Sequence, residues 1–148
     1  MFENSIYPGV HSALAQLGVL GTTLYVVTSK PRVFAKRIVD HFGLKAYFRA
    51  VFGSELDGMR SNKGELIAHV LAQESLLPDL RYMVGDRAHD VIGAKTNGVV
   101  PVGALWGYGT REELSAAGAT VFCERPQMLG EVLLSNTGVR PASISERR

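Results

Sequence analysis

Residues 82–98 read YMVGDRAHDVIGAKTNG, and this stretch decides the expected fold. Its first four residues, Tyr82–Gly85, form a short apolar run that predicts a strand. A helix is expected from about His89 to Asn97, and Gly98 is typical of the residue that ends one. A strand that leads directly into a helix is the repeating unit of an α/β protein with a parallel sheet.

The same alternation continues along the rest of the chain. β-branched and aromatic runs predict strands at residues 23–28, 50–53, 99–105 and 120–123. Apolar residues at helical spacing predict helices at residues 31–42, after residues 61–63, from residue 110 and at residues 126–134. Because the strands are apolar almost throughout, we expect an α/β fold in which a parallel sheet has helices on both faces.

Composition and charge limit the expected number of domains, the partners and the location of the protein. We expect one domain over residues 1–134, followed by a polar, disordered tail over residues 135–148. The tail carries three arginines and one glutamate, so it accounts for the whole net charge of +2 and the body is neutral. This distribution indicates no nucleic-acid partner. No apolar run approaches the roughly 18 residues of a membrane span, and no signal peptide is evident, so we expect a cytoplasmic protein.

Two carboxylates, Asp86 and Asp90, stand where the strand at Tyr82 turns into its helix. Ligands of parallel α/β sheets bind at the carboxyl ends of the strands. Hard carboxylate oxygens suit Mg²⁺, which usually takes one or two of them together with water and phosphate oxygens. The alternative is that one of the two carboxylates only caps the helix. The order of strand, Gly-Asp, second Asp and helix favours the metal site.

Two further groups lie at comparable places. Thr28 and Ser29 follow the first predicted strand, where hydroxyls and free backbone N–H groups can hold phosphate oxygens. The alternative for both is a helix cap. Lys63 opens the helix after the strand at Ala50 and could neutralise a phosphoryl group. The alternative for Lys63 is a solvated surface charge.

Together these stretches resemble the haloacid dehalogenase superfamily, in its phosphoglycolate-phosphatase-like branch. Residues 24–31 resemble its second motif, residues 61–63 its third, and residues 84–94 its acidic fourth motif. Residues 105–110 match a segment common in this branch, and residues 7–10 resemble the point where an inserted cap returns to the core. The resemblance covers about residues 6–134.

The resemblance implies a Mg²⁺-dependent hydrolase of small phosphomonoesters that works through an aspartyl-phosphate. Thr28, with Ser29 beside it, would bind the phosphoryl oxygens, and Lys63 would neutralise them. Asp86 would ligate Mg²⁺, and Asp90 would support or share the metal site. The cap largely selects the substrate in this superfamily, so phosphoglycolate and nucleoside monophosphates both stay open.

The first family motif, D-x-D-G-T, is missing from this chain. None of the five aspartates forms D-x-D, and Glu55-Leu56-Asp57-Gly58-Met59 lies in the wrong place and has Glu where the nucleophile belongs. In the family this motif follows a central strand, between the strands that end here at Thr28 and Gly85. The Rossmann-like core is therefore expected to lack its central first strand and its cap.

An open sheet of this kind leaves backbone groups unpaired. The chain should fold poorly alone, self-associate through the open edges, or belong to a longer protein. In the last case the start at Met1 is internal, and upstream coding sequence would contain D-x-D-G-T. The first alternative is a non-catalytic module that binds phosphate or Mg²⁺ or pairs with another chain. A receiver-like signalling domain ranks last, because its acidic pair and acceptor aspartate are not visible.

Overall fold

The structure is a computed structural model that describes residues 8–60, 62–79 and 81–137. After helix α1 (Val10–Val19), strands alternate with helices along the whole described chain. The first half holds β1 (Tyr25–Pro31), α2 (Arg32–His41), a 3-10 turn at Lys45–Tyr47, β2 (Ala50–Ser54) and α3 (Lys63–Gln73). The second half holds β3 (Tyr82–Gly85), α4 (Ala88–Thr96), β4 (Val100–Ala104), α5 (Arg111–Ala117), β5 (Val121–Cys123), a 3-10 turn at Pro126–Met128 and α6 (Leu129–Thr137).

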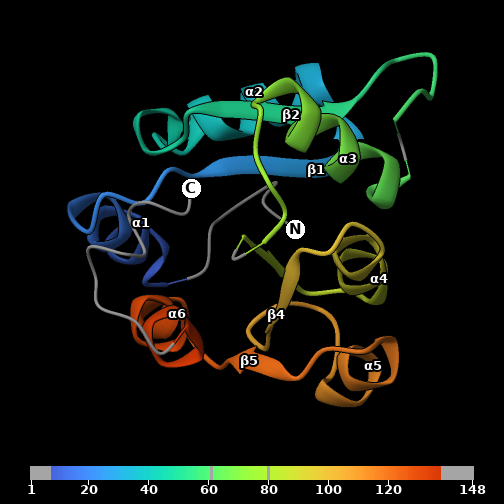
Figure 1. The fold of residues 1–148 in the computed structure, drawn as a ribbon. Helices are drawn as coiled ribbons and strands as arrows, with labels where there is room; N and C mark the ends of the chain where they lie inside the picture. The colour runs from blue at the N-terminus through green and yellow to red at the C-terminus, as the bar shows by residue number, and fades with distance from the viewer. Residues whose placement is uncertain (1–7, 61, 80, 138–148) are drawn as a thin grey trace.

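The strands form two parallel sheets instead of one. β1 pairs with β2, and β4 lies between β3 and β5. Helices α1 and α6 lie on one side of these strands, and α3, α4 and α5 lie on the other (Figure 1). The predicted α/β class, with parallel strands flanked by helices, is therefore confirmed.

No ladder joins β1 to β3 in the part of the chain that the structure describes. The residues of β3 are only half-buried, as are most residues of β1, although β3 is apolar and β1 begins with an apolar run. In contrast, the second half of β4 is fully buried. The pattern is that of a sheet interrupted between β1 and β3, where the sequence indicates a missing central strand.

Element bounds differ from the sequence expectations by a few residues, most clearly at α2 and α6, and one helix was not predicted. Pro31 ends β1 in an extended conformation (φ −55°, ψ 136°), so α2 begins one residue later than predicted. Helix α6 continues to Thr137, three residues into the predicted tail, and residues 138–148 lie outside the described residues. Helix α1 was not predicted at all, although its buried residues Ala13 and Leu17 are four positions apart.

The core is split between the two faces of the strands. On one face, Leu17 of α1 packs with Leu129 and Leu133 of α6. On the other face, Leu66 of α3 and Leu114 of α5 are fully buried, in separate clusters. No helix in residues 8–60, 62–79 and 81–137 has the length and hydropathy that a membrane crossing needs.

Candidate functional site

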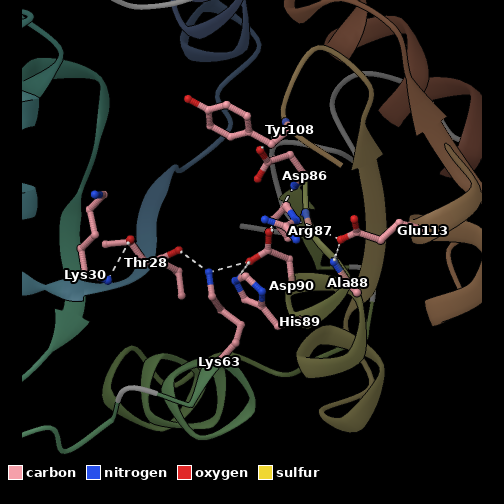
Figure 2. Close-up of polar contacts among 11 residues, drawn as sticks. Thr28, Lys30, Lys63, Asp86, Arg87, Ala88, His89, Asp90, Tyr108 and Glu113 are labelled. Atoms are coloured by element: carbon pink, nitrogen blue, oxygen red, sulfur yellow. Dashed lines mark hydrogen bonds and ion pairs between the residues drawn. The ribbon is translucent and has the colours of Figure 1, made fainter. Parts of the chain in front are cut away.

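The predicted site residues come together at one end of the gap between the two sheets. A cavity of about 650 Å³ lies between β1 and β3. All five candidates line it, from three different elements and the loop after β3: Thr28, Ser29, Lys63, Asp86 and Asp90. Figure 2 shows Lys63 reaching from α3 into the space between β1 and the junction of β3 with α4, where Asp86 lies in the loop and Asp90 in the first turn of the helix.

Lys63 is held in place by two partners. Its ammonium lies 2.6 Å from Asp90 Oδ1 and donates a hydrogen bond to the backbone oxygen of Val27 at 3.1 Å. The side chains of Lys63 and Asp90 are only 6% and 7% exposed. A solvated surface charge is thereby excluded for this lysine. Lys63 presents a fixed positive charge at the carboxyl end of β1.

The Asp90 carboxylate binds both the backbone of the loop after β3 and the ammonium of Lys63. Its Oδ2 accepts hydrogen bonds from the backbone N–H groups of Asp86 and Arg87, at 3.1 and 3.2 Å. Its Oδ1 faces Lys63, and His89 Nε2 approaches the same oxygen at 3.7 Å. Asp90 therefore does cap the start of α4, as the alternative held, and it also orients Lys63. A direct role as metal ligand stays a prediction for this residue.

Asp86 is the carboxylate with a free oxygen at the cavity. Its Oδ2 accepts a hydrogen bond from the backbone N–H of Tyr108 at 2.9 Å, and its backbone oxygen accepts one from Gly109 at 2.9 Å. No described residue donates to its Oδ1. A Cβ at Gly107 would collide with the Asp86 side chain. The loop after β4 thus clamps Asp86 while leaving one oxygen available.

Thr28 makes a local turn instead of a helix cap. Its Oγ1 accepts a hydrogen bond from the backbone N–H of Lys30 at 3.2 Å. The N-cap position of α2 belongs to Pro31, where no side chain caps the helix. The cap alternative is therefore wrong for both Thr28 and Ser29. Their place on the cavity wall agrees with the predicted contact to phosphate oxygens, which stays a prediction.

Glu113 was not predicted as a site residue from the sequence. Its side chain holds the junction between β3 and α4. Its Oε2 accepts hydrogen bonds from Arg87 Nε at 3.0 Å and from the backbone N–H of Ala88 at 2.8 Å. These two bonds, the one from Arg87 first, lower the pKa of the Glu113 carboxyl below its ordinary 4.5. The spacing of Thr110 and Glu113 is typical of a helix cap, and Thr110 Oγ1 accepts a hydrogen bond from the Glu113 backbone N–H. That spacing does not indicate the contacts of the Glu113 side chain with Arg87 and Ala88.

Replacing Glu113 with Gln should lower the urea midpoint of unfolding near neutral pH. A carboxyl whose pKa is lowered by folding stabilises the fold above its unfolded pKa, and that contribution disappears as pH falls through the folded pKa. The difference between Glu113→Gln and wild type should therefore vanish below both pKa values. Glu112→Gln, at an exposed neighbour in the same helical turn, is the control and should change little. An equal deficit at neutral and acidic pH would refute this role.

The carboxylate oxygens at the cavity provide only part of the ligands that a magnesium ion needs. Carboxylate oxygens are suitable ligands, and Asp86 Oδ1 is free at the cavity. Within the described ranges, no group of three or more His, Cys, Asp or Glu side chains could enclose a metal. Mg²⁺ commonly keeps water and phosphate oxygens as ligands, so Asp86 could hold it with Asp90 nearby. A further carboxylate would complete the set.

Comparison with known proteins finds one matching family and several relatives of this chain. A model of haloacid dehalogenase-like hydrolases matches residues 3–104. A protein of Pseudomonas aeruginosa named 5'-nucleotidase is 44% identical over 136 residues, which cover 92% of this chain and 62% of that protein. The tyrosine-protein kinase PtkA of Mycobacterium tuberculosis is 42% identical over 118 residues, which cover 80% of this chain and 40% of that protein.

A solved structure agrees over nearly the same length. The crystal structure of a predicted phosphatase from Clostridium acetobutylicum superposes with a TM-score of 0.83 at 37% identity. The superposition covers 91% of this chain and 61% of that one. The chain therefore spans less than two thirds of each of these relatives.

Proposed function

Since the chain belongs to the haloacid dehalogenase-like hydrolase family, we propose that it carries the phosphoryl- and Mg²⁺-binding half of a phosphomonoester hydrolase. The observation that carries this proposal is the convergence of Thr28, Lys63 and Asp86 on one cavity. A hydroxyl, a fixed ammonium and a free carboxylate oxygen are the groups that a phosphoryl-transfer site needs.

Each side chain has a distinct task in this proposal. Lys63 neutralises the phosphoryl oxygens without moving, because Asp90 and the Val27 carbonyl already hold its ammonium. Thr28 donates its hydroxyl hydrogen to a phosphoryl oxygen, since its Oγ1 accepts from Lys30. Asp86 offers Oδ1 to Mg²⁺. When bound, that ion would offset the negative charge of the transferring group.

The nucleophile comes from outside this chain. Asp90 is engaged by Lys63 and two backbone N–H groups, and Asp86 is clamped as a ligand. In the proposed reaction, a carboxylate oxygen on a segment outside this chain attacks phosphorus and the bond from phosphorus to the substrate oxygen breaks. That oxygen takes a proton from a second carboxyl group of the same segment and leaves as the alcohol. Water then cleaves the aspartyl-phosphate and releases inorganic phosphate. A nucleoside 5'-monophosphate is the first substrate to test because of the Pseudomonas relative, and phosphoglycolate is the second.

A non-catalytic role is the second candidate. It is favoured by one observation: Asp86 and Asp90 are the only aspartates among the cavity-lining residues. In that case the chain binds Mg²⁺ or phosphate without turnover. Both candidates suit a cytoplasmic protein with a small phosphorylated ligand. The two candidate functions differ in one expected outcome. Adding a carboxylate nucleophile makes the site catalytic only in the first.

Replacing Asp86 with Asn should weaken Mg²⁺ binding at least about tenfold, because even second-shell changes at metal sites cost that much. The amide keeps the size of the side chain but loses the charge that holds the ion. Isothermal titration of the purified chain with MgCl₂ measures the effect. Asp79→Asn, on an exposed loop away from the cavity, is the matched control. Equal Mg²⁺ affinity in both variants would remove Asp86 from the proposed site.

A further inference from the structure

The loop after β4 is pressed against Asp86 at two glycines. A Cβ at Gly107 would collide with the side chain of Asp86, and a Cβ at Gly109 would collide with its backbone oxygen. The backbone N–H groups of Tyr108 and Gly109 donate to Asp86 Oδ2 and to the same backbone oxygen, each at 2.9 Å. The loop is therefore fixed on Asp86 at three consecutive residues, and Tyr108 is the one that carries a side chain.

Tyr108 holds an aromatic ring beside the proposed metal ligand. Its backbone nitrogen lies 2.9 Å from Asp86 Oδ2, so its Cα is within about 4.4 Å of that oxygen. The residue is 65% exposed, and Figure 2 shows the ring next to the Asp86 carboxylate, on the side away from Asp90. In the described part of the chain, its ring meets no other ring and its hydroxyl makes no hydrogen bond. A single exposed tyrosine is ordinary, but the backbone of this one is fixed at a candidate ligand site.

The cavity determines how a phosphomonoester can enter. Its polar end, where Asp86 lies, is at the carboxyl end of β3, whereas the deeper wall is apolar and includes Val26 and Met83. The charged phosphate binds at the polar end, because burying charge against apolar side chains is costly. The organic group then extends outward past the strand ends. Gly107 lines the cavity at this edge and Tyr108 follows it, so the ring lies on the path of the organic group.

A planar organic group suits this position best. A tyrosine ring offers a large contact area at a low cost in conformational entropy, and nucleobases stack well on such rings. An organic group with a carboxylate, such as that of phosphoglycolate, would need a cation instead. Arg87, the cation next to Asp86 in the sequence, is already engaged, because its Nε donates to Glu113 at 3.0 Å.

We propose that Tyr108 is a specificity-determining residue that stacks its ring on the base of a nucleoside 5'-monophosphate. The phosphate of this ligand lies at Thr28, Lys63 and Asp86, so the inference rests on the proposed function and adds the residue that recognises the organic group. Stacking contacts the face of a base and not its edges, so the site should accept all four bases. The Tyr108 hydroxyl is not needed for stacking, so phenylalanine should replace tyrosine.

The test is a nuclear magnetic resonance titration of the isotope-labelled full chain in MgCl₂ with adenosine 5'-monophosphate and with ribose 5-phosphate. Both ligands have a sugar and a 5-phosphate, and only the first has a base. Stacking of one base typically strengthens binding by roughly fivefold to a hundredfold, so wild type should bind adenosine 5'-monophosphate at least about fivefold more tightly. Tyr108→Ala should remove this difference by weakening only the nucleotide, and Tyr108→Phe should keep it.

Two controls separate stacking from support of the loop. Tyr108→Ala keeps the backbone N–H that donates to Asp86, so its affinities for Mg²⁺ and for ribose 5-phosphate should equal those of wild type. Tyr47→Ala, in the 3-10 turn before β2, removes the same kind of side chain at the amino end of the strands. This variant should bind adenosine 5'-monophosphate as wild type does.

Equal affinity of wild type for the two ligands would overturn the inference, as would an unchanged difference in Tyr108→Ala or its loss in Tyr108→Phe. Weaker Mg²⁺ binding by Tyr108→Ala would also overturn it, because the side chain would then support the loop. All of these results leave the proposed function intact. Failure of the folded wild type to bind either ligand would instead refute the proposed function, and the inference with it.

Discussion

Replacing Lys63 with Met is expected to destabilise the fold by about 3–5 kcal/mol, the usual cost of removing one partner of a buried ion pair. The cost arises because Asp90 would keep a buried charge without the ammonium that now lies 2.6 Å away. The Val27 carbonyl would lose its donor as well. Urea unfolding followed by circular dichroism measures this change in the free energy of unfolding.

The control for Lys63→Met is Lys36→Met on the exposed side of α2, which should stay within about 0.5 kcal/mol of wild type. Adding Asp90→Asn to Lys63→Met should recover part of the loss, because the buried charge is then gone. A loss below about 1 kcal/mol for Lys63→Met would mean that solvent reaches the pair. The fixed ammonium that the proposed function needs would then not exist.

Replacing Gly85 with Ala should cost about 1–3 kcal/mol, as overpacking does, and should disturb the site further. A Cβ at this position would collide with the Cβ, Cγ and Oδ2 atoms of Asp90. Because Asp90 orients Lys63 and caps α4, its displacement should also weaken Mg²⁺ binding at Asp86. Urea unfolding and calorimetric titration with MgCl₂ report the two effects separately.

Gly18→Ala is the matched control for Gly85→Ala, because nothing lies within 4 Å of a Cβ at Gly18 in α1. In a helix, this change should be neutral or stabilising by up to about 1 kcal/mol. Opposite signs for the two substitutions would confirm that the close approach of Asp90 is responsible. A neutral Gly85→Ala would show that the loop can move aside at little cost.

Local patterns predicted most of the element order. The apolar run at Tyr82–Gly85 and the glycine at position 98 correctly place β3 and the end of α4. Helix α1 precedes the first strand and was not predicted. Its apolar spacing at Ala13 and Leu17 was a usable signal.

Contacts across the chain were harder to predict than the elements. Spacing could bring Asp86 and Asp90 to one strand-to-helix junction, but it could not show that Asp90 pairs with Lys63, 27 positions earlier. The clamp on Asp86 comes from the backbone N–H of Tyr108, and a backbone donor leaves no signature in residue type. The missing family motif correctly indicated where the sheet is interrupted.

The most direct test of the central claim is a phosphatase assay of the chain with and without a supplied nucleophile. The segment of the Pseudomonas aeruginosa 5'-nucleotidase that lies outside its aligned region would be fused to this chain, with folding checked by circular dichroism. We expect no hydrolysis of nucleoside monophosphates by the chain alone. We expect Mg²⁺-dependent hydrolysis by the fusion, and loss of that activity in the fusion with Asp86→Asn. Activity of the chain alone, a folded but inactive fusion, or full activity of the Asp86→Asn fusion would refute the proposed function.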